Sequence, residues 1–155
     1  MQHALLEPWP AEIVDRLRLS DTDRAYLKTI GLPQDSDWTL TFGPTQPHAE
    51  RSPGMVTIGN DATVPICVDT RSGRVVVRES DHEVRLVSSS LPMFGKFLAL
   101  YDTYRRTVVD LHDEAEIAAL ISRIEGEMIA VDPDAMKDPE HYWSVVVEQM
   151  RDGLL

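Results

Sequence analysis

A chain of 155 residues with 43% hydrophobic and 26% charged residues has the size and composition of one globular domain, not of a disordered segment. Its formal net charge of −11 argues against direct binding to nucleic acid or to an anionic membrane, because both need a basic protein surface. The charge suits a basic protein partner, although solubility alone also explains it. We therefore expect a single domain over residues 1–155.

The sequence carries no sign of secretion or membrane insertion. Cys67 is the only cysteine, so no disulfide can form within the chain. The first ten residues lack the basic and long apolar regions of a signal peptide. No uninterrupted run of roughly 18 apolar residues occurs, as a membrane helix requires. The expected location is cytoplasmic.

Two helices are predicted before the first strand. Residues 10–19 show helical spacing of apolar side chains, and residues 20–23 (S-D-T-D) resemble a capping box that opens a second helix. Gly31 and Pro33 are typical of its end. Residues 38–42 (W-T-L-T-F) alternate as a strand does, and residues 43–54, with three prolines, predict a long loop that is either functional or a connector.

A three-stranded meander is predicted over residues 55–79. Its β-branched runs at residues 56–58, 64–68 and 74–78 are separated by turn-forming clusters, and residues 84–87 can add a fourth strand. We expect residues 59–61 to supply any positive φ of the first turn and Gly73 to close the second. Pro65 belongs near a strand start or edge because it has no N–H to donate.

Two amphipathic helices follow the meander. Ser88, Ser89 and Ser90 are candidate N-caps of a helix that should cover the sheet. Its apolar stripe comprises Phe94, Phe97, Leu98, Tyr101, Tyr104 and Val108. A second helix is expected to begin near Asp113, with one apolar face formed by Ile117, Leu120, Ile121, Ile124 and Met128. Its opposite side is small enough to admit another packed element (Ala119, Ser122 and Gly126), so monomer and homodimer are both open.

The last helix is predicted to follow a proline-rich break. Residues 132–134 (D-P-D) interrupt the chain, and Asp138 with Pro139 has the pattern of an N-cap followed by a proline in the first helical turn. The expected buried stripe is Trp143, Val146, Val147 and Met150, and Gly153 ends the helix. The fold class is therefore α+β, with a central, mostly antiparallel sheet flanked by helices.

No residue pattern indicates catalysis. The five histidines, at positions 3, 48, 82, 112 and 141, lack the spacing of metal ligands, so we expect no metal and no cofactor. Cys67 with His82 offers a nucleophile for a small hydrolase, but a lone strand cysteine is more often a core residue. The carboxylate pairs Asp21 with Asp23 and Asp132 with Asp134 are better explained as helix starts.

Acidic residues concentrate in the C-terminal part of the chain. Residues 91–155 hold thirteen acids and six bases, a net charge of −7 out of −11. A solvated acidic face is the simple interpretation, and a binding surface for a cationic protein is the sharper one. The candidate partner-binding residues are Asp110, Asp113, Glu114, Glu116, Glu125 and Glu127.

Three blocks of the sequence resemble those of a known protein family. They are L-K-T-I-G-L-P at residues 27–33, I-G-N-D-A-T-V-P-I-C-V-D-T-R-S-G-R-V-V-V at residues 58–77, and S-S-S-L-P-M-F-G-K-F-L-A-L-Y at residues 88–101, followed by a C-terminal helix with a tryptophan. Together they resemble the SUKH superfamily of bacterial immunity proteins, and most closely its fourth subfamily. Relatives often have Asn before the central helix, where this chain has Ser88 and Ser89.

The resemblance implies a SUKH-like α+β domain without catalytic activity. Proteins of this kind bind and neutralise a cognate polymorphic toxin, frequently a nuclease or a nucleic-acid deaminase. Such a toxin is expected to be basic where it holds nucleic acid, which suits an acidic inhibitor. The alternative is a regulatory or adaptor domain, the role of eukaryotic relatives of the superfamily in cell-wall signalling.

Overall fold

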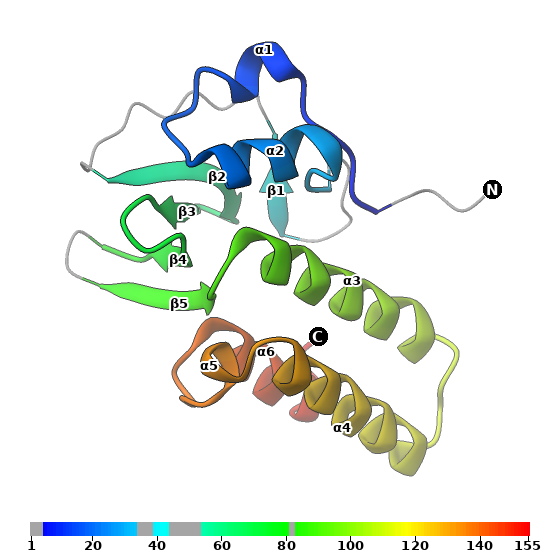
Figure 1. Ribbon diagram of the computed structural model, residues 1–155. Coiled ribbons are helices and arrows are strands. Elements are labelled where there is room, and N and C mark those ends of the chain that lie inside the picture. Colours follow the sequence, from blue (N-terminus) through cyan, green and yellow to red (C-terminus); the bar gives the residue numbers. More distant parts are fainter. Residues whose placement is uncertain (1–4, 34–38, 44–53, 81–82) are drawn as a thin grey trace.

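One antiparallel sheet and a set of helices make up the computed structural model, which describes residues 5–33, 39–43, 54–80 and 83–155 (Figure 1). Within these ranges, five strands pair in chain order: β1 (Leu40–Phe42), β2 (Met55–Asp61), β3 (Val64–Asp69), β4 (Val75–Arg78) and β5 (Val84–Ser88). The helices are α1 (Ala11–Val14), α2 (Asp21–Thr29), α3 (Leu91–Val108), α4 (Glu114–Val131), α5 (Pro133–Met136) and α6 (Tyr142–Arg151). The predicted α+β class with a meander sheet is confirmed.

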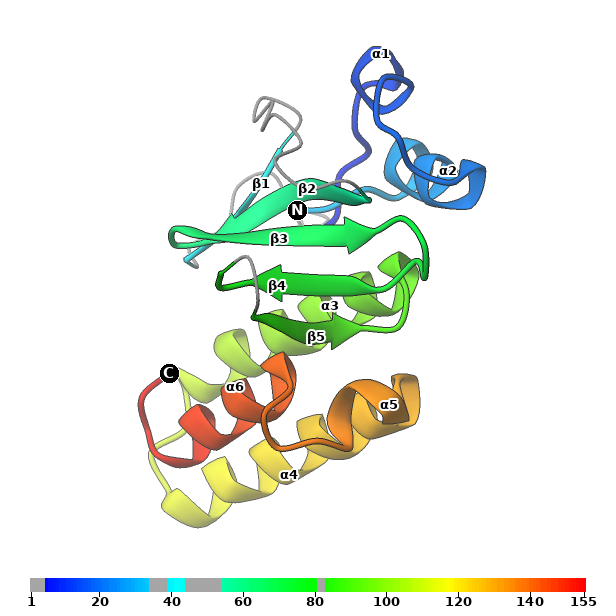
Figure 2. The ribbon, with the colours of Figure 1, turned by 90° about the vertical axis from the view of Figure 1, so that its left-hand side faces the viewer.

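The core lies between the sheet and α3. Alternate residues of β3 and β4, such as Ile66, Val68 and Val77, are buried because their side chains face the helices. Phe42 of β1 and Phe94 of α3 meet edge to face, with ring centroids 5.7 Å apart. Figure 2 shows α3 behind the sheet, as the apolar stripe of residues 94–108 predicted.

The face of the sheet turned away from the core is also partly dry. Cys67 and Val76 are directly opposite each other on β3 and β4, and both are buried, at 2% and 6% exposure. Figure 2 views this face and shows no helix in front of it. Neighbouring side chains of the sheet therefore contribute to covering this pair.

One of the two hairpin turns of the meander has its positive φ at the expected residue, and the other does not. Gly73 has a φ of +75° in the β3–β4 turn, as predicted. In the β2–β3 turn the positive φ, +52°, belongs to Ala62, so the assignment to residues 59–61 is wrong. Gly59 lies inside β2, where an added Cβ would come within 2.5 Å of the Phe42 ring and the Thr41 carbonyl oxygen. Close packing explains this glycine.

Of the two N-terminal helices, α2 begins and ends as predicted, and α1 is shorter than predicted. Ser20 caps α2 by accepting a hydrogen bond from the Asp23 amide at 3.1 Å, and Gly31 follows that helix with a φ of +80°. Helix α1 is a single turn that ends at Val14, so the helix predicted over residues 10–19 is too long. Trp38 and residues 44–53 of the predicted long loop lie outside the described residues.

The C-terminal region contains a short helix, α5, at the Asp132 and Asp134 pair that was interpreted as a helix start. Asp132 caps the short helix α5, and Pro133 stands in its first turn. The carboxylate of Asp138 instead accepts a hydrogen bond from the Glu140 amide at 2.9 Å, which makes a turn, and α6 begins only at Tyr142. The predicted helix start at Asp138 and Pro139 is therefore wrong. The buried stripe of Trp143, Val146, Val147 and Met150 and the terminating Gly153 are confirmed.

Ser90 and Asp113 cap the two long helices. Ser90 accepts a hydrogen bond from the Met93 amide at 3.3 Å, and Asp113 accepts one from the Ala115 amide at 2.7 Å. Both helices thus begin where the serine run and the Asp113 pattern predicted. In the described ranges, no helix is both long and apolar enough to cross a membrane.

Candidate functional site

A cleft of about 440 Å³ opens between the inner face of the sheet and helices α3 and α6. We call it the interlayer cleft and define it by six polar side chains: Asp61, Glu79, Arg85, Tyr101, Arg105 and Tyr142. These six residues come from β2 and β5, from the residue that follows β4, and from α3 and α6. The cleft therefore collects residues from segments that are far apart in the sequence.

Asp61 is the best-organised charge in the interlayer cleft. It is the last residue of β2, half-buried, and pairs in register with Leu40 of β1 and Val64 of β3. Its Oδ1 accepts a hydrogen bond from the Thr39 hydroxyl and its Oδ2 accepts one from the Tyr142 hydroxyl, both at 2.8 Å. Two neutral donors thus hold the carboxylate in place.

Tyr142 and its aromatic neighbours form the helical wall of the cleft. The ring of Tyr142 stands edge to face with that of Trp143, with centroids 5.2 Å apart, and the Tyr101 ring lies 5.8 Å from Trp143. Burial, the charge of Asp61 and the hydrogen bond to it raise the pKa of Tyr142 well above its usual range. Tyr142 therefore remains a neutral donor to Asp61 at any physiological pH.

The remaining charges of the cleft are distributed between its two walls. Arg85 of β5 pairs with Glu79, with 3.2 Å between nitrogen and oxygen. Arg105 reaches the cleft from α3, and both it and Asp61 act on Tyr101: burial raises the pKa of Tyr101, Arg105 lowers it, and the neighbouring Tyr104 and Asp61 raise it. Such a site, polar at its centre and aromatic on one wall, is suited to binding a charged group against a ring face.

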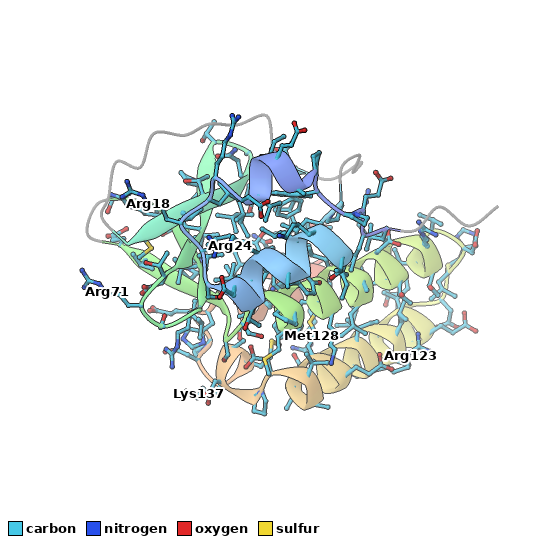
Figure 3. All side chains as sticks on the ribbon, turned by 45° about the horizontal axis from the view of Figure 1, so that its top comes forward. Arg18, Arg24, Arg71, Arg123, Met128 and Lys137 are labelled. Carbon is cyan, nitrogen blue, oxygen red and sulfur yellow. The ribbon has the colours of Figure 1, made fainter. Side chains whose placement is uncertain are left out.

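The six predicted partner-binding acids do not form one patch. Glu114 and Glu125 are eleven residues apart on α4, about three helical turns, so they share one side of the helix. Glu116 and Glu127 share the other side, and the buried stripe that includes Ile124 runs between the two pairs. Figure 3 shows Met128 on this helix beneath α3 and Arg123 pointing outward.

Two of these acids have structural partners, and five of the six are exposed. Asp113 caps α4, and Glu125 pairs with Arg151 of α6 at 2.9 Å. The exposed acids are Asp110, Asp113, Glu114, Glu116 and Glu127. Glu114 and Glu116 stand in the first turn of α4, and Asp110 precedes this helix.

A second, shallow depression lies between α3 and α4. It has a volume of about 460 Å³ and a mostly apolar lining: Lys96, Ala99, Leu100, Thr103, Glu127, Ala130 and Val131. Glu127 is the predicted site residue that it contains. The small residues on the back of α4 (Ala119, Ser122 and Gly126) are exposed, and no described element packs on them.

Cys67 lacks the surroundings of a catalytic nucleophile. Its thiol is buried, its nearest polar contact is the Thr57 hydroxyl at 3.6 Å, and burial raises its pKa. A thiolate is thereby disfavoured, and a reactant has no access. His82, its proposed base, lies outside the described residues together with His3 and His48. Among the residues that are described, no three potential metal ligands gather.

The residues of the interlayer cleft were not predicted as a site. Tyr101 was assigned to the apolar stripe of α3, Asp61 to a turn, and Tyr142 to no role. Their only shared signal is polar character at the margin of apolar stripes, which is common on any protein surface. Tyr142 and Asp61 are 81 positions apart, so no local spacing relates them.

The architecture and the cleft together define the class: a small α+β protein whose antiparallel meander is covered on one face by helices, with a polar cleft between the layers. The family model described as SUKH-4 immunity protein matches residues 3–149. The chain therefore belongs to the SUKH-4 immunity protein family, and the predicted membership is confirmed. No curated protein and no solved structure gives a significant match.

Proposed function

We propose that this protein is a non-enzymatic, cytoplasmic immunity protein that binds a cognate toxin domain and blocks it by covering its functional surface. The match of the SUKH-4 immunity family over residues 3–149 is the observation that carries the proposal. A polymorphic toxin that cleaves or deaminates nucleic acid is the expected partner. Such an enzyme must be basic where it holds phosphate groups, so an acidic protein can compete for that surface.

The charge distribution supports direct electrostatic association. Residues 91–155 carry −7 of the net charge of −11, and Asp110, Glu114 and Glu116 are exposed near the start of α4. Complementary potentials of this kind accelerate encounter by one to three orders of magnitude, roughly, when the ionic strength is low. We assign the first contact with the toxin to these acids at the start of α4, together with Asp113; Glu125 and Glu127 add negative charge further along the two sides of the helix.

Co-purification tests the proposed function. The tagged protein is expressed together with the products of neighbouring genes, above all the C-terminal domain of any large secreted protein. The expected result is retention of a basic, toxic domain whose nucleic-acid-modifying activity is lost in the complex and whose toxicity to cells is suppressed. Recovery of a non-toxic host protein in its place would overturn the proposal in favour of an adaptor.

A further inference from the structure

Asp61 has an unusual status among the charged residues of the interlayer cleft. Both of its carboxylate oxygens accept hydrogen bonds, but the donors are the neutral hydroxyls of Thr39 and Tyr142. No lysine or arginine of the described chain lies within ion-pair distance of it. A carboxylate has about four acceptor positions, so each oxygen of Asp61 keeps one for a further donor.

The other charges of the cleft already have partners. Arg85 and Glu79 neutralise each other at 3.2 Å. Arg105 takes part in an interaction of its own. Among the described residues of the cleft, Asp61 is a carboxylate whose hydrogen-bond partners are neutral, so a cationic ligand can neutralise it. A half-buried, pre-oriented carboxylate gives such a pair more energy than an exposed one, because solvent screens it less.

The aromatic wall of the cleft favours a guanidinium group over an ammonium group. The rings of Tyr101 and Tyr142 are half-buried and border the same cleft as Asp61, with buried Trp143 behind them. A guanidinium group is planar, stacks on aromatic rings and donates several hydrogen bonds at once, whereas an ammonium group is a compact, strongly hydrated charge. A volume of about 440 Å³ lies in the range of ligand pockets and accommodates a long side chain with adjoining backbone.

We propose that the interlayer cleft is an anchor site for an arginine side chain of the protein partner, with Asp61 binding the guanidinium and the aromatic wall, above all Tyr142, packing against it. The identity of that partner as a toxin rests on the proposed function, but the recognition of a guanidinium does not. The acidic surface near α4 provides long-range attraction, and the cleft provides the short-range contact that slows dissociation.

A model ligand tests the cleft without any toxin. Acetyl-arginine amide is titrated into the isotopically labelled protein and followed by the amide NMR signals. The expected result is weak, saturable binding. The largest chemical-shift changes should occur at residues that border the cleft, namely Thr39, Asp61, Tyr101 and Tyr142. Acetyl-citrulline amide, which has the same shape without the charge, should bind at least about tenfold more weakly, since it lacks the charge-assisted hydrogen bonds.

Two variants and a control locate the interaction. Asp61→Asn removes the charge with little change of shape and should weaken binding of acetyl-arginine amide about tenfold. Tyr142→Phe keeps the ring and removes the hydroxyl that positions Asp61, so it should weaken binding by a smaller factor. Asp15→Asn removes one charge directly after α1, outside the cleft lining, and should leave binding unchanged. A folded Asp61→Asn protein that binds the ligand as the parent does would overturn the proposal, as would equal binding of the citrulline compound.

The same variants separate this inference from the proposed function. Once co-purification identifies a toxin domain, Asp61→Asn is expected to increase its dissociation rate about tenfold and to leave its association rate nearly constant. If the protein neutralises a toxin but Asp61→Asn dissociates as the parent does, the anchor site is refuted and the immunity function stands. If no toxin is retained but acetyl-arginine amide binds at Asp61, the function fails and the anchor site remains.

Discussion

Two helical glycines differ in the space around their absent side chains. An added Cβ at Gly95 of α3 would come within 1.9 Å of the hydroxyl oxygen and 3.1 Å of the Cζ atom of Tyr26, which is 8% exposed. An added Cβ at Gly126 of α4 would have no atom within 4 Å. Gly95 therefore permits the contact between α2 and α3, whereas Gly126 contributes no such contact.

This difference predicts opposite effects of the same substitution. Gly95→Ala should lower the free energy of unfolding by about 1–3 kcal/mol, because the buried Tyr26 ring has to move. Gly126→Ala should raise it by about 0.5–1 kcal/mol, since alanine loses less backbone entropy in a helix. Urea denaturation of the two variants measures both. Equal effects of the two substitutions would show that Tyr26 yields without cost.

Residue type alone does not separate such glycines. Gly59 precedes Asn60 and Asp61, a combination typical of turns, but its place in β2 is decided by the ring of Phe42 from a neighbouring strand. Gly31 and Gly73 were predicted correctly because both have a positive φ, although the backbone of Glu7 also leaves no room for a Cβ at Gly31. Sequence thus identifies glycines needed by the local backbone, and it misses those needed by a distant side chain.

At the scale of elements, Asp132 joins two junctions of the chain. It is 2% exposed, and its carboxylate accepts hydrogen bonds from the Ser89 amide at 2.6 Å and the Ser89 hydroxyl at 2.8 Å, in addition to capping α5 through the Ala135 amide. Ser89 lies between β5 and α3, and Asp132 lies between α4 and α5. The contact therefore fixes the end of α4 against the edge of the sheet.

Loss of this contact should destabilise the fold substantially. Asp132→Ala removes the acceptor of the part-buried Ser89 amide and the cap of α5, which predicts a decrease of about 2–3 kcal/mol in the free energy of unfolding. Asp134→Ala is the matched control: Asp134 is exposed, and its pair with Lys137 is worth little, so the change should stay within about 0.5 kcal/mol. Thermal and urea unfolding test both variants, and similar values for the two would contradict the assigned role.

The same contact explains where prediction of the elements succeeded and failed. The strands and the long helices follow from β-branched runs, capping residues and apolar stripes, all of which are local signals. The Asp-Pro pair occurs twice, at residues 132–133 and 138–139, and either can start a helix. Only the first has its carboxylate bound to Ser89 from another junction, and such long-range contacts are invisible to local patterns. The interlayer cleft was missed for the same reason.

At the scale of the whole molecule, the acidic charge lies unevenly. The exposed acids at the start of α4 belong to the lower part of the molecule in Figure 1, whereas α1 and α2 lie at the top. Different residues thus provide the long-range attraction and the short-range contact. Substitutions at the start of α4 should change the association rate, and substitutions at Asp61 should change the dissociation rate.

Reversal of charge at the start of α4 tests this arrangement. Glu114→Lys with Glu116→Lys should slow association with the co-purified toxin domain about five- to tenfold at low ionic strength, with little effect near 0.5 M salt, because a Debye length of about 4 Å screens the attraction there. Stopped-flow mixing at both ionic strengths measures the rates. Glu12→Lys with Asp21→Lys is the control, since both residues are exposed acids in the first turns of α1 and α2 and disturb helix starts to a similar degree. If both double variants slow association equally, net charge alone governs encounter, and the surface near α4 has no special role. If neither does, the toxin approaches by another face.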